Sequence, residues 1–238
     1  MKIVISHGSG GIGSAETFAR DFFESKGYDV HLIDYFTPHG IDRLRWSERE
    51  PDNYNVTFKE MFNVDFPEGD LVHIGFSLGA FLGIVNHAKF VKNYLFYPGV
   101  LGITQEMLDV DYSNASVITC GNDKGKYKYE KFKSLLKKPP LAEYMLPYTH
   151  HAFMIEDINF EFNMVRYNTT DNIMSSEEFS QLKPNHKYLS ERYGHTTSYT
   201  HLLFDKEMRW QYLNHIEEDI NETFPSIRKR NNLHENSV

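Results

Sequence analysis

The chain has 238 residues, a length that one hydrophobic core can support, so we expect a single domain over residues 1–238. Hydrophobic residues make up 40% of the chain and charged residues 24%, ordinary proportions for a globular protein that exclude global disorder. The formal net charge of -8 argues against a nucleic-acid partner, because phosphate binding needs a concentrated basic face. Cys120 is the only cysteine, and no apolar run is long enough for a signal peptide or a membrane span. We therefore expect a cytoplasmic protein with no membrane partner.

Strand-like and helix-like segments alternate along the first part of the chain. Runs of aliphatic and aromatic residues predict buried strands at Lys2–Ser6, Tyr28–Asp34, Leu71–Phe76, Tyr94–Tyr97, Ser116–Cys120 and Glu143–Pro147. Apolar spacing predicts helices at Ala15–Ser25, Phe58–Phe62, Ser77–Ala88, Gln105–Leu108 and Tyr129–Leu136. This alternation predicts an α/β fold, a three-layer α/β/α sandwich with a mostly parallel sheet. Ligand chemistry in such a fold belongs at the carboxyl ends of the strands.

The segment 154–200 is rich in aromatic residues and shows no clear alternation. We interpret it either as a cap over a ligand pocket or as an insertion that covers the surface with its own aromatic residues. A final helix is expected after it, because apolar residues recur every four positions at Met208, Tyr212, Ile216 and Ile220.

The sequence Gly75-Phe76-Ser77-Leu78-Gly79 places a G-x-S-x-G motif between an expected strand and an expected helix. A serine in this position is held on a tight turn that lifts its hydroxyl above the sheet as a candidate nucleophile. Gly75 and Gly79 relieve the crowding of that turn. The helix that follows directs its free N–H groups at a developing oxyanion, so the amide of Leu78 is a candidate donor. The alternative interpretation is a small-residue turn before a packed helix.

The loop after the first expected strand supplies a second candidate donor. It reads His7-Gly8-Ser9-Gly10-Gly11, and its glycines let backbone N–H groups approach a substrate oxygen closely. We expect the amide of Ser9 or Gly10 to complete the oxyanion hole with Leu78.

Two further residues complete a candidate catalytic triad in the chain order serine, acid, histidine. Asp123 and His151 each follow the end of an expected strand. We expect Ser77 to attack the substrate, His151 to take its proton, and Asp123 to orient the imidazole and stabilise its charged form. His150 is the alternative base.

The first loop also fits a dinucleotide-binding turn. Residues 8–13 match G-x-G-x-x-G, and Asp34 ends the next expected strand, where a ribose-binding acid is expected. Tyr127 and Lys131 form a Y-x-x-x-K, so this part of the chain resembles the short-chain dehydrogenases. That interpretation leaves the motif at Ser77 unexplained.

The chain most resembles the α/β-hydrolases, and among them the dienelactone hydrolases. The resemblance rests on HGSGG at 7–11, GFSLGA at 75–80, the loop at Asp123 and HAF at 151–153. It implies an α/β-hydrolase fold that lacks the antiparallel strands often found before the oxyanion loop. It also implies that His7 braces that loop.

Dienelactone hydrolases use a cysteine nucleophile, so serine in this chain favours ordinary esters or thioesters. We therefore expect a serine hydrolase that cleaves a small ester or thioester through an acyl-enzyme, with a small-molecule substrate and with no cofactor or metal. Two alternatives stay open: an NAD(P)-dependent dehydrogenase that uses the loop at residues 8–13, and a catalytically silent hydrolase-like scaffold. The sequence does not define the oligomeric state.

Overall fold

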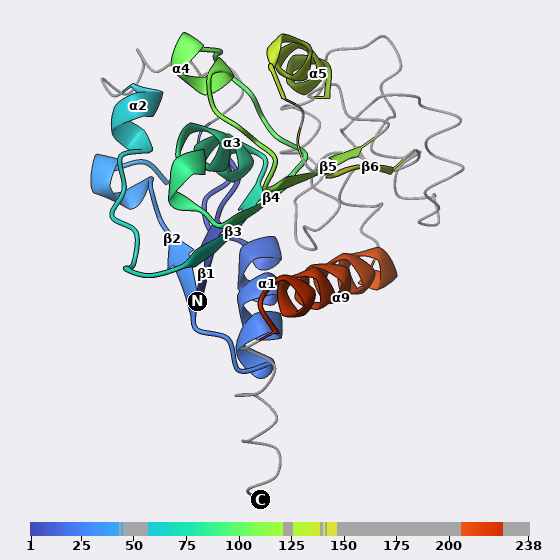
Figure 1. Ribbon diagram of the computed structural model, residues 1–238. Helices are drawn as coiled ribbons and strands as arrows, with labels where there is room; N and C mark the ends of the chain where they lie inside the picture. Colours follow the sequence, from blue (N-terminus) through green and yellow to red (C-terminus); the bar gives the residue numbers. More distant parts are fainter. Residues whose placement is uncertain are drawn as a thin grey trace, which may run out of the picture.

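The computed structural model describes residues 1–42, 44, 57–120, 126–138, 140, 142–146 and 206–225. Within these residues, six strands form one sheet in the order β2-β1-β3-β4-β5-β6, and each neighbouring pair is parallel (Figure 1). The strands are β1 (Lys2–Ser6), β2 (Val30–Ile33), β3 (Leu71–Phe76), β4 (Lys92–Phe96), β5 (Ala115–Cys120) and β6 (Ala142–Leu146). The predicted parallel sheet is confirmed. The segment 154–200 lies outside the described residues, so both interpretations of it stay predictions.

Helices cover both faces of the sheet, as in the predicted sandwich (Figure 1). One face packs against α1 (Ser14–Ser25) and α9 (Lys206–Thr223). The other face carries α2 (Phe58–Met61), α3 (Leu78–Val85), α4 (Gln105–Leu108) and α5 (Lys126–Leu135). Short 3₁₀ turns lie at Thr37–His39 and His87–Lys89.

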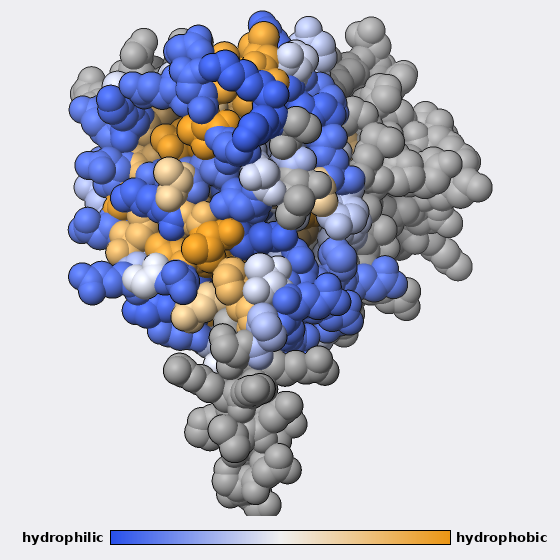
Figure 2. Space-filling model, viewed as in Figure 1, coloured by the Kyte–Doolittle hydropathy of each residue, from blue (hydrophilic) through white to orange (hydrophobic). Residues whose placement is uncertain are grey.

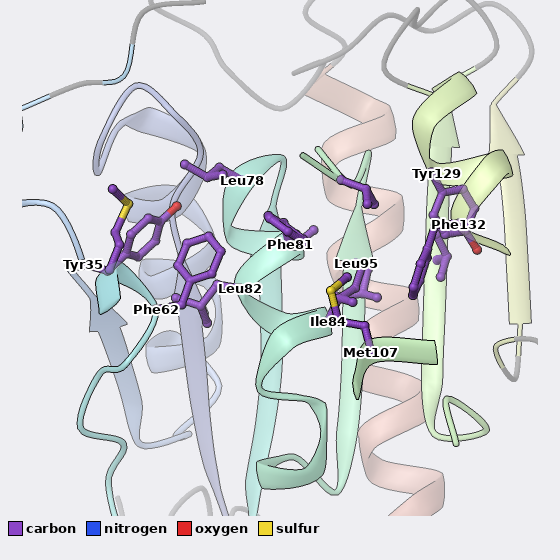
Figure 3. Packing of buried hydrophobic residues seen from close by; sticks show 14 of the residues in the cluster. Tyr35, Phe62, Leu78, Phe81, Leu82, Ile84, Leu95, Met107, Tyr129 and Phe132 are labelled. Carbon is purple, nitrogen blue, oxygen red and sulfur yellow. The ribbon is translucent and has the colours of Figure 1, made fainter. Parts of the chain in front are cut away.

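Strand β4 contributes apolar side chains to both layers of the core. On β4, Tyr94 and Phe96 join the cluster beneath α1 and α9, whereas Leu95 joins the cluster beneath α3. Figure 3 shows Leu95 in this second cluster together with Leu78 and Phe81 of α3. Strands that are buried on both faces have continuous apolar sequences, which is why the sequence predicts their positions so well.

Helix α9 lays an apolar stripe on the sheet and is held there by polar contacts at its edge. The residues of this stripe that are buried are Leu213, Ile216 and Ile220. Trp210 packs edge-on against Phe22 of α1, with ring centroids 5.2 Å apart. Asp219 forms a salt bridge with Lys92 at the start of β4, with an N–O distance of 2.8 Å. The predicted final helix is confirmed.

Strand β2 and helix α3 are the elements that are at least three residues shorter than the sequence predicts. Strand β2 excludes Tyr28 and Asp34 because both make hydrogen bonds outside the ladder. The amide of Tyr28 closes the C-terminal end of α1, and the carboxylate of Asp34 accepts a hydrogen bond from the amide of Phe36 at 2.9 Å. Helix α3 ends at Val85 instead of Ala88, because a 3₁₀ turn follows it.

Strand β4 and helix α5 begin at least two residues earlier than predicted. Strand β4 starts at Lys92, not Tyr94, because the polar side chains of Lys92 and Asn93 are buried and bonded inside the fold. Helix α5 starts at Lys126 and not at Tyr129. Its first turn contains exposed Tyr127, so it carries no apolar periodicity that would reveal it.

Apolar side chains also reach the surface between α2, α3 and α4, where Figure 2 shows hydrophobic residues gathered. A groove of about 740 Å³ lies there, and Phe58, Phe62, Phe81, Val85 and Met107 are among the residues that line it.

Candidate active site

Ser77 occupies a sharp turn between the end of β3 and the start of α3. Its backbone has φ 54° and ψ -104°, a conformation that side-chain-bearing residues rarely adopt and that costs about 1–3 kcal/mol. The turn is fixed by hydrogen bonds: the amide of Ser77 donates to the carbonyl oxygen of Phe96, and the amide of Gly99 donates to the carbonyl oxygen of Ser77, both at 2.9 Å. A strained residue held so firmly at a strand end is typical of a functional site.

The glycines of the motif are needed for space and not for an unusual φ angle. A Cβ atom on Gly75 would lie 2.6 Å from the carbonyl oxygen of Gly79 and 2.7 Å from the amide of Ala80. A Cβ atom on Gly79 would lie 2.7 Å from the carbonyl oxygen of His7 and even closer to that of Ser6. The prediction that both glycines relieve crowding is therefore confirmed, and the second one lets α3 approach β1.

The N-terminus of α3 and the loop after β1 meet at the switch point of the sheet. The chain passes from β1 to β2 on one side of β1 and then crosses to β3 on the other side, so β1 and β3 are the strands that flank this point. Ligands of open α/β sheets bind where strand order reverses in this way. Ser77 follows β3, and Gly8 follows β1; a Cβ atom on Gly8 would lie 3.5 Å from the Cβ of Ser77. The loop and the serine are thus in contact range.

The loop after β1 is held by a buried carboxylate. Glu16, in the first turn of α1, is 3% exposed. Its side chain accepts hydrogen bonds from the amide of Gly8 at 3.1 Å and from the amide of Gly13 at 2.9 Å. The carbonyl oxygen of Gly8 in turn accepts a hydrogen bond from the amide of Gly11 at 3.2 Å. Both backbone groups of Gly8 are therefore engaged, and the next residues, Ser9 and Gly10, are the candidates that face a ligand.

His7 and Tyr35 form a buried wall behind the same loop. Their rings are stacked with centroids 4.0 Å apart. Nδ1 of His7 donates to the carbonyl oxygen of Gly8 at 2.7 Å, and the hydroxyl of Tyr35 donates to the carbonyl oxygen of His7. Burial lowers the pKa of His7 although Asp34 lies nearby, and burial raises the pKa of Tyr35 well above its usual value. Both rings are neutral at pH 7, and their contacts fit the bracing role expected of His7.

A buried polar network ties α3 to the sheet beneath Ser77. Nδ1 of His73 donates to Oδ1 of Asn93 at 2.7 Å, and Nε2 of His73 lies 2.7 Å from the hydroxyl of Ser6, which also donates to the carbonyl oxygen of Gly79 at 3.0 Å. The amide group of Asn93 donates to the carbonyl oxygen of Gly83 at 2.9 Å and to Nδ1 of His87 at 3.1 Å. Burial lowers the pKa of His73 to about 4, so its ring stays neutral. These bonds fix the position of α3 and of the turn before it.

The candidate oxyanion donors, the amides of Leu78, Ser9 and Gly10, belong to the start of α3 and to the loop after β1. Leu78 is the first residue of α3, and its amide has no hydrogen-bond acceptor among the described residues. The amide of Gly10 likewise has none within that part of the chain. Free amides at a helix N-terminus favour negative charge. Ser9 is 4% exposed, and its carbonyl oxygen accepts a hydrogen bond from the amide of Leu44 at 2.8 Å.

The other two triad residues, Asp123 and His151, lie outside the described residues, as does the alternative base His150. The strands that precede them are β5 and β6, which follow β4 in the sheet and run parallel to β3. The carboxyl ends of β5 and β6 therefore lie at the same edge of the sheet as Ser77. Assignment of the acid and the base stays a prediction.

The structure does not favour the dinucleotide-binding alternative. The strand order typical of dinucleotide-binding domains places the third strand beyond the second, whereas β3 here lies beside β1. Glu16 places a carboxylate on the amides of Gly8 and Gly13, where a pyrophosphate would need to bind. Asp34 accepts hydrogen bonds from the backbone that follows it, and Tyr127 is 75% exposed.

Three residues of this region were not singled out by the sequence. Gly99 binds the carbonyl of Ser77, and a Cβ atom on it would lie 3.5 Å from the Ser77 hydroxyl. Tyr97 is a second residue with positive φ, 38°, and its amide donates to the carbonyl of Ile118 at 2.6 Å. Glu16 could have been found from the sequence. It is the third residue of α1, and a glutamate at this position is typical of a helix cap.

Two other features, membrane-spanning helices and clusters of metal ligands, were searched for in the described part of the chain. None of its helices has the length and hydropathy needed to cross a membrane. Nor does this part of the chain bring three or more histidine, cysteine, aspartate or glutamate side chains together as metal ligands.

The strand order and the strained serine turn after β3 are those expected of the α/β-hydrolase fold that the sequence predicts. No family model matches the sequence, and no curated protein matches it. Several solved structures are similar to the chain. A dienelactone hydrolase-like promiscuous phosphotriesterase from metagenomic libraries is 13% identical, with a TM-score of 0.44 and coverage of 81% of this chain and 87% of its own.

Alpha/beta hydrolase domain-containing protein 10 from mouse is 12% identical, with a TM-score of 0.44 and coverage of 69% of this chain and 86% of its own. A methylesterase from Arabidopsis is 10% identical, with a TM-score of 0.42 and coverage of 69% and 97% respectively.

Proposed function

We propose that the protein is a serine hydrolase that cleaves a small ester or thioester bond, with Ser77 as the nucleophile. The observation that carries this proposal is the backbone of Ser77, which has φ 54° on a turn between β3 and α3. Such a turn exposes the hydroxyl at the carboxyl edge of the sheet, above the N-terminus of the following helix. The loop at Gly8 supports the proposal, because a Cβ atom on Gly8 would lie 3.5 Å from the Cβ of Ser77.

The reaction proceeds in two steps through an acyl-enzyme. In the first, the Ser77 oxygen attacks the substrate carbonyl while His151 takes the hydroxyl proton, and His151 then gives that proton to the leaving alcohol or thiol. In the second, water attacks the acyl-enzyme while His151 takes a proton from it; the bond between the acyl carbon and Ser77 Oγ then breaks, His151 returns the proton to Ser77, and the acid product leaves. Asp123 orients the imidazole and stabilises its charged form.

Backbone amides stabilise the tetrahedral intermediate of both steps. The amide of Leu78 is one donor and the amide of Ser9 or Gly10 is the other. Loss of one such donor typically lowers turnover by about 10²–10³. The fixed geometry of α3 and of the loop after β1 supports this role, because donors that are already oriented need no reorganisation during the reaction.

Hydrolysis of p-nitrophenyl acetate tests the proposal. We expect a burst of p-nitrophenol equal to the enzyme concentration, because acylation releases the alcohol before the acyl-enzyme is hydrolysed. Substitutions Ser77→Ala, Asp123→Asn and His151→Ala are each expected to lower turnover by about 10⁴. His150→Ala serves as the matched control, and full activity in this variant assigns the base to His151.

Two outcomes contradict the assignments. Loss of activity in His150→Ala with full activity in His151→Ala would make His150 the base. No turnover by the wild-type chain over a broad panel of esters and thioesters would instead favour a silent scaffold.

A further inference from the structure

Glu16 makes one contact that helix capping explains and one that it does not. Its carboxylate accepts from the amide of Gly13 at 2.9 Å, which is the usual bond between a glutamate in the first turn of a helix and the residue before that helix. The second bond joins α1 to the loop after β1: the carboxylate accepts from the amide of Gly8 at 3.1 Å. The side chain is 3% exposed, so both bonds form away from water.

The residue that Glu16 holds lies against the candidate nucleophile. A Cβ atom on Gly8 would be 3.5 Å from the Cβ of Ser77 and 3.5 Å from the carbonyl oxygen of Phe76. The opposite side of Gly8 is held by the ring of His7, which donates to its carbonyl oxygen at 2.7 Å. Gly8 is thus fixed by a carboxylate on its N–H and by an imidazole on its C=O.

We propose that Glu16 is a positioning residue for the oxyanion hole: it fixes the amide of Gly8 so that the following amides, of Ser9 or Gly10, point at the substrate oxygen. This inference rests on the proposed function. A carboxylate suits this role because it has two oxygens that accept hydrogen bonds. One oxygen binds the N–H of Gly8 and the other binds the N–H of Gly13. Bonds to a charged acceptor are also stronger than neutral ones, which helps to keep the donor geometry fixed.

Glu16→Gln tests the proposal with little change in shape. The amide group of glutamine can accept from only one of the two N–H groups and turns a donor toward the other. We expect kcat for p-nitrophenyl acetate to fall at least about 10-fold with little change in KM, since a misplaced oxyanion donor costs less than the about 10²–10³ of an absent one. The inhibition constant of benzeneboronic acid, which forms a tetrahedral adduct on a nucleophilic serine, should rise by the same factor.

Glu60 provides a matched control. It occupies the same place in the first turn of α2, and its carboxylate accepts from the amide of Thr57 at 2.7 Å. Glu60→Gln therefore removes the same kind of helix cap at a position that makes no contact with the loop at Gly8. We expect both variants to lower the melting temperature, but only Glu16→Gln to change kcat and boronate affinity.

Chemical rescue separates positioning from folding. Glu16→Ala leaves a space where the carboxylate was, and formate is small enough to bind the two amides there. We expect formate to restore part of the lost turnover of Glu16→Ala and to have no such effect on Ser77→Ala or Glu60→Ala. A helix that was merely destabilised would not regain boronate affinity on addition of formate.

The outcomes distinguish this inference from the proposed function. Wild-type protein that neither hydrolyses esters nor binds benzeneboronic acid would overturn the proposed function itself. An active wild type whose Glu16→Gln variant keeps its kcat and boronate affinity, or whose Glu16→Ala variant loses activity that formate does not restore, would overturn the role of Glu16.

Discussion

Helix α3 approaches β1 so closely that the carbonyl oxygen of Ser6 occupies the space where a side chain on Gly79 would begin. We expect Gly79→Ala to lower the free energy of unfolding by about 3 kcal/mol or more, because the backbone of β1 or of α3 must move. Urea denaturation measures the change. Gly102→Ala is the matched control, since a Cβ atom on Gly102 meets nothing within 4 Å and should change stability by less than about 1 kcal/mol. Equal stability of the two variants would contradict the close approach.

The strain at Ser77 predicts an unusual order of stability among its variants. Glycine accepts a φ of 54° without the steric penalty that alanine and serine pay. We expect Ser77→Gly to have a free energy of unfolding about 1 kcal/mol above that of Ser77→Ala, even though glycine makes the unfolded chain more flexible. Thermal or urea denaturation of the pair decides the point. A Ser77→Ala variant as stable as Ser77→Gly would show that the turn is not strained.

The buried histidines predict a loss of stability in mild acid. Burial lowers the pKa of His73 to about 4 from 6.5, and it lowers the pKa of His7 and of His87 as well. These histidines therefore bind protons in the unfolded chain at pH values where they stay neutral in the folded chain. As a result, the free energy of unfolding decreases as pH falls from about 6.5 towards 4. For His73 alone the loss approaches about 3 kcal/mol.

Urea denaturation at pH 7.5, 6, 5 and 4.5 measures this slope. We expect His73→Gln to be less stable than wild type at pH 7.5 but to show a shallower slope between pH 6 and 4.5. The same slope in both proteins would contradict the assignment of the proton uptake to His73.

The contact between α9 and β4 contains a buried charge. The side chain of Lys92 is 7% exposed and pairs with Asp219, which also accepts a hydrogen bond from the hydroxyl of Tyr94 at 2.7 Å. Bonds from Lys92 and Tyr94 lower the pKa of Asp219 against the opposing effect of its partial burial. We expect Asp219→Asn to lower the free energy of unfolding by about 3 kcal/mol because Lys92 loses its partner.

Tyr94→Phe is the milder control for this contact, because it removes one hydrogen bond and should cost about 1 kcal/mol. Calorimetry of both variants measures the difference. A loss no larger in Asp219→Asn than in Tyr94→Phe would contradict a buried, charged Lys92.

The pattern of apolar residues predicted most strands and helices of the fold. It failed where polar residues are buried inside an element. Strand β3 was predicted with its observed ends because a mostly apolar run, interrupted by His73, lies between Asp70 and the turn at Ser77. The start of β4 was missed because Lys92 and Asn93 look like surface residues, and their partners on other elements are invisible in a linear pattern. The sequence therefore predicts the apolar part of a strand well. It predicts poorly that polar residues also belong to a strand when distant contacts bury them.

The sequence predicted some parts of the candidate site and missed others. The turn at Ser77 and its glycines follow from local spacing, which the structure confirms. The contact of Glu16 with Gly8 depends on how the loop folds back over α1, and no local pattern encodes it. Asp123 and His151 lie outside the described residues, so their roles stay predictions from chain order and strand ends.

The nucleophile itself is tested most directly by labelling with a fluorophosphonate, which reacts with serines that an enzyme has activated. Mass spectrometry of the intact wild-type protein should show one added phosphonyl group, and digestion should place it on Ser77. The Ser77→Ala variant should remain unlabelled. A wild type that gains no mass, or a Ser77→Ala variant that gains as much, would contradict the account.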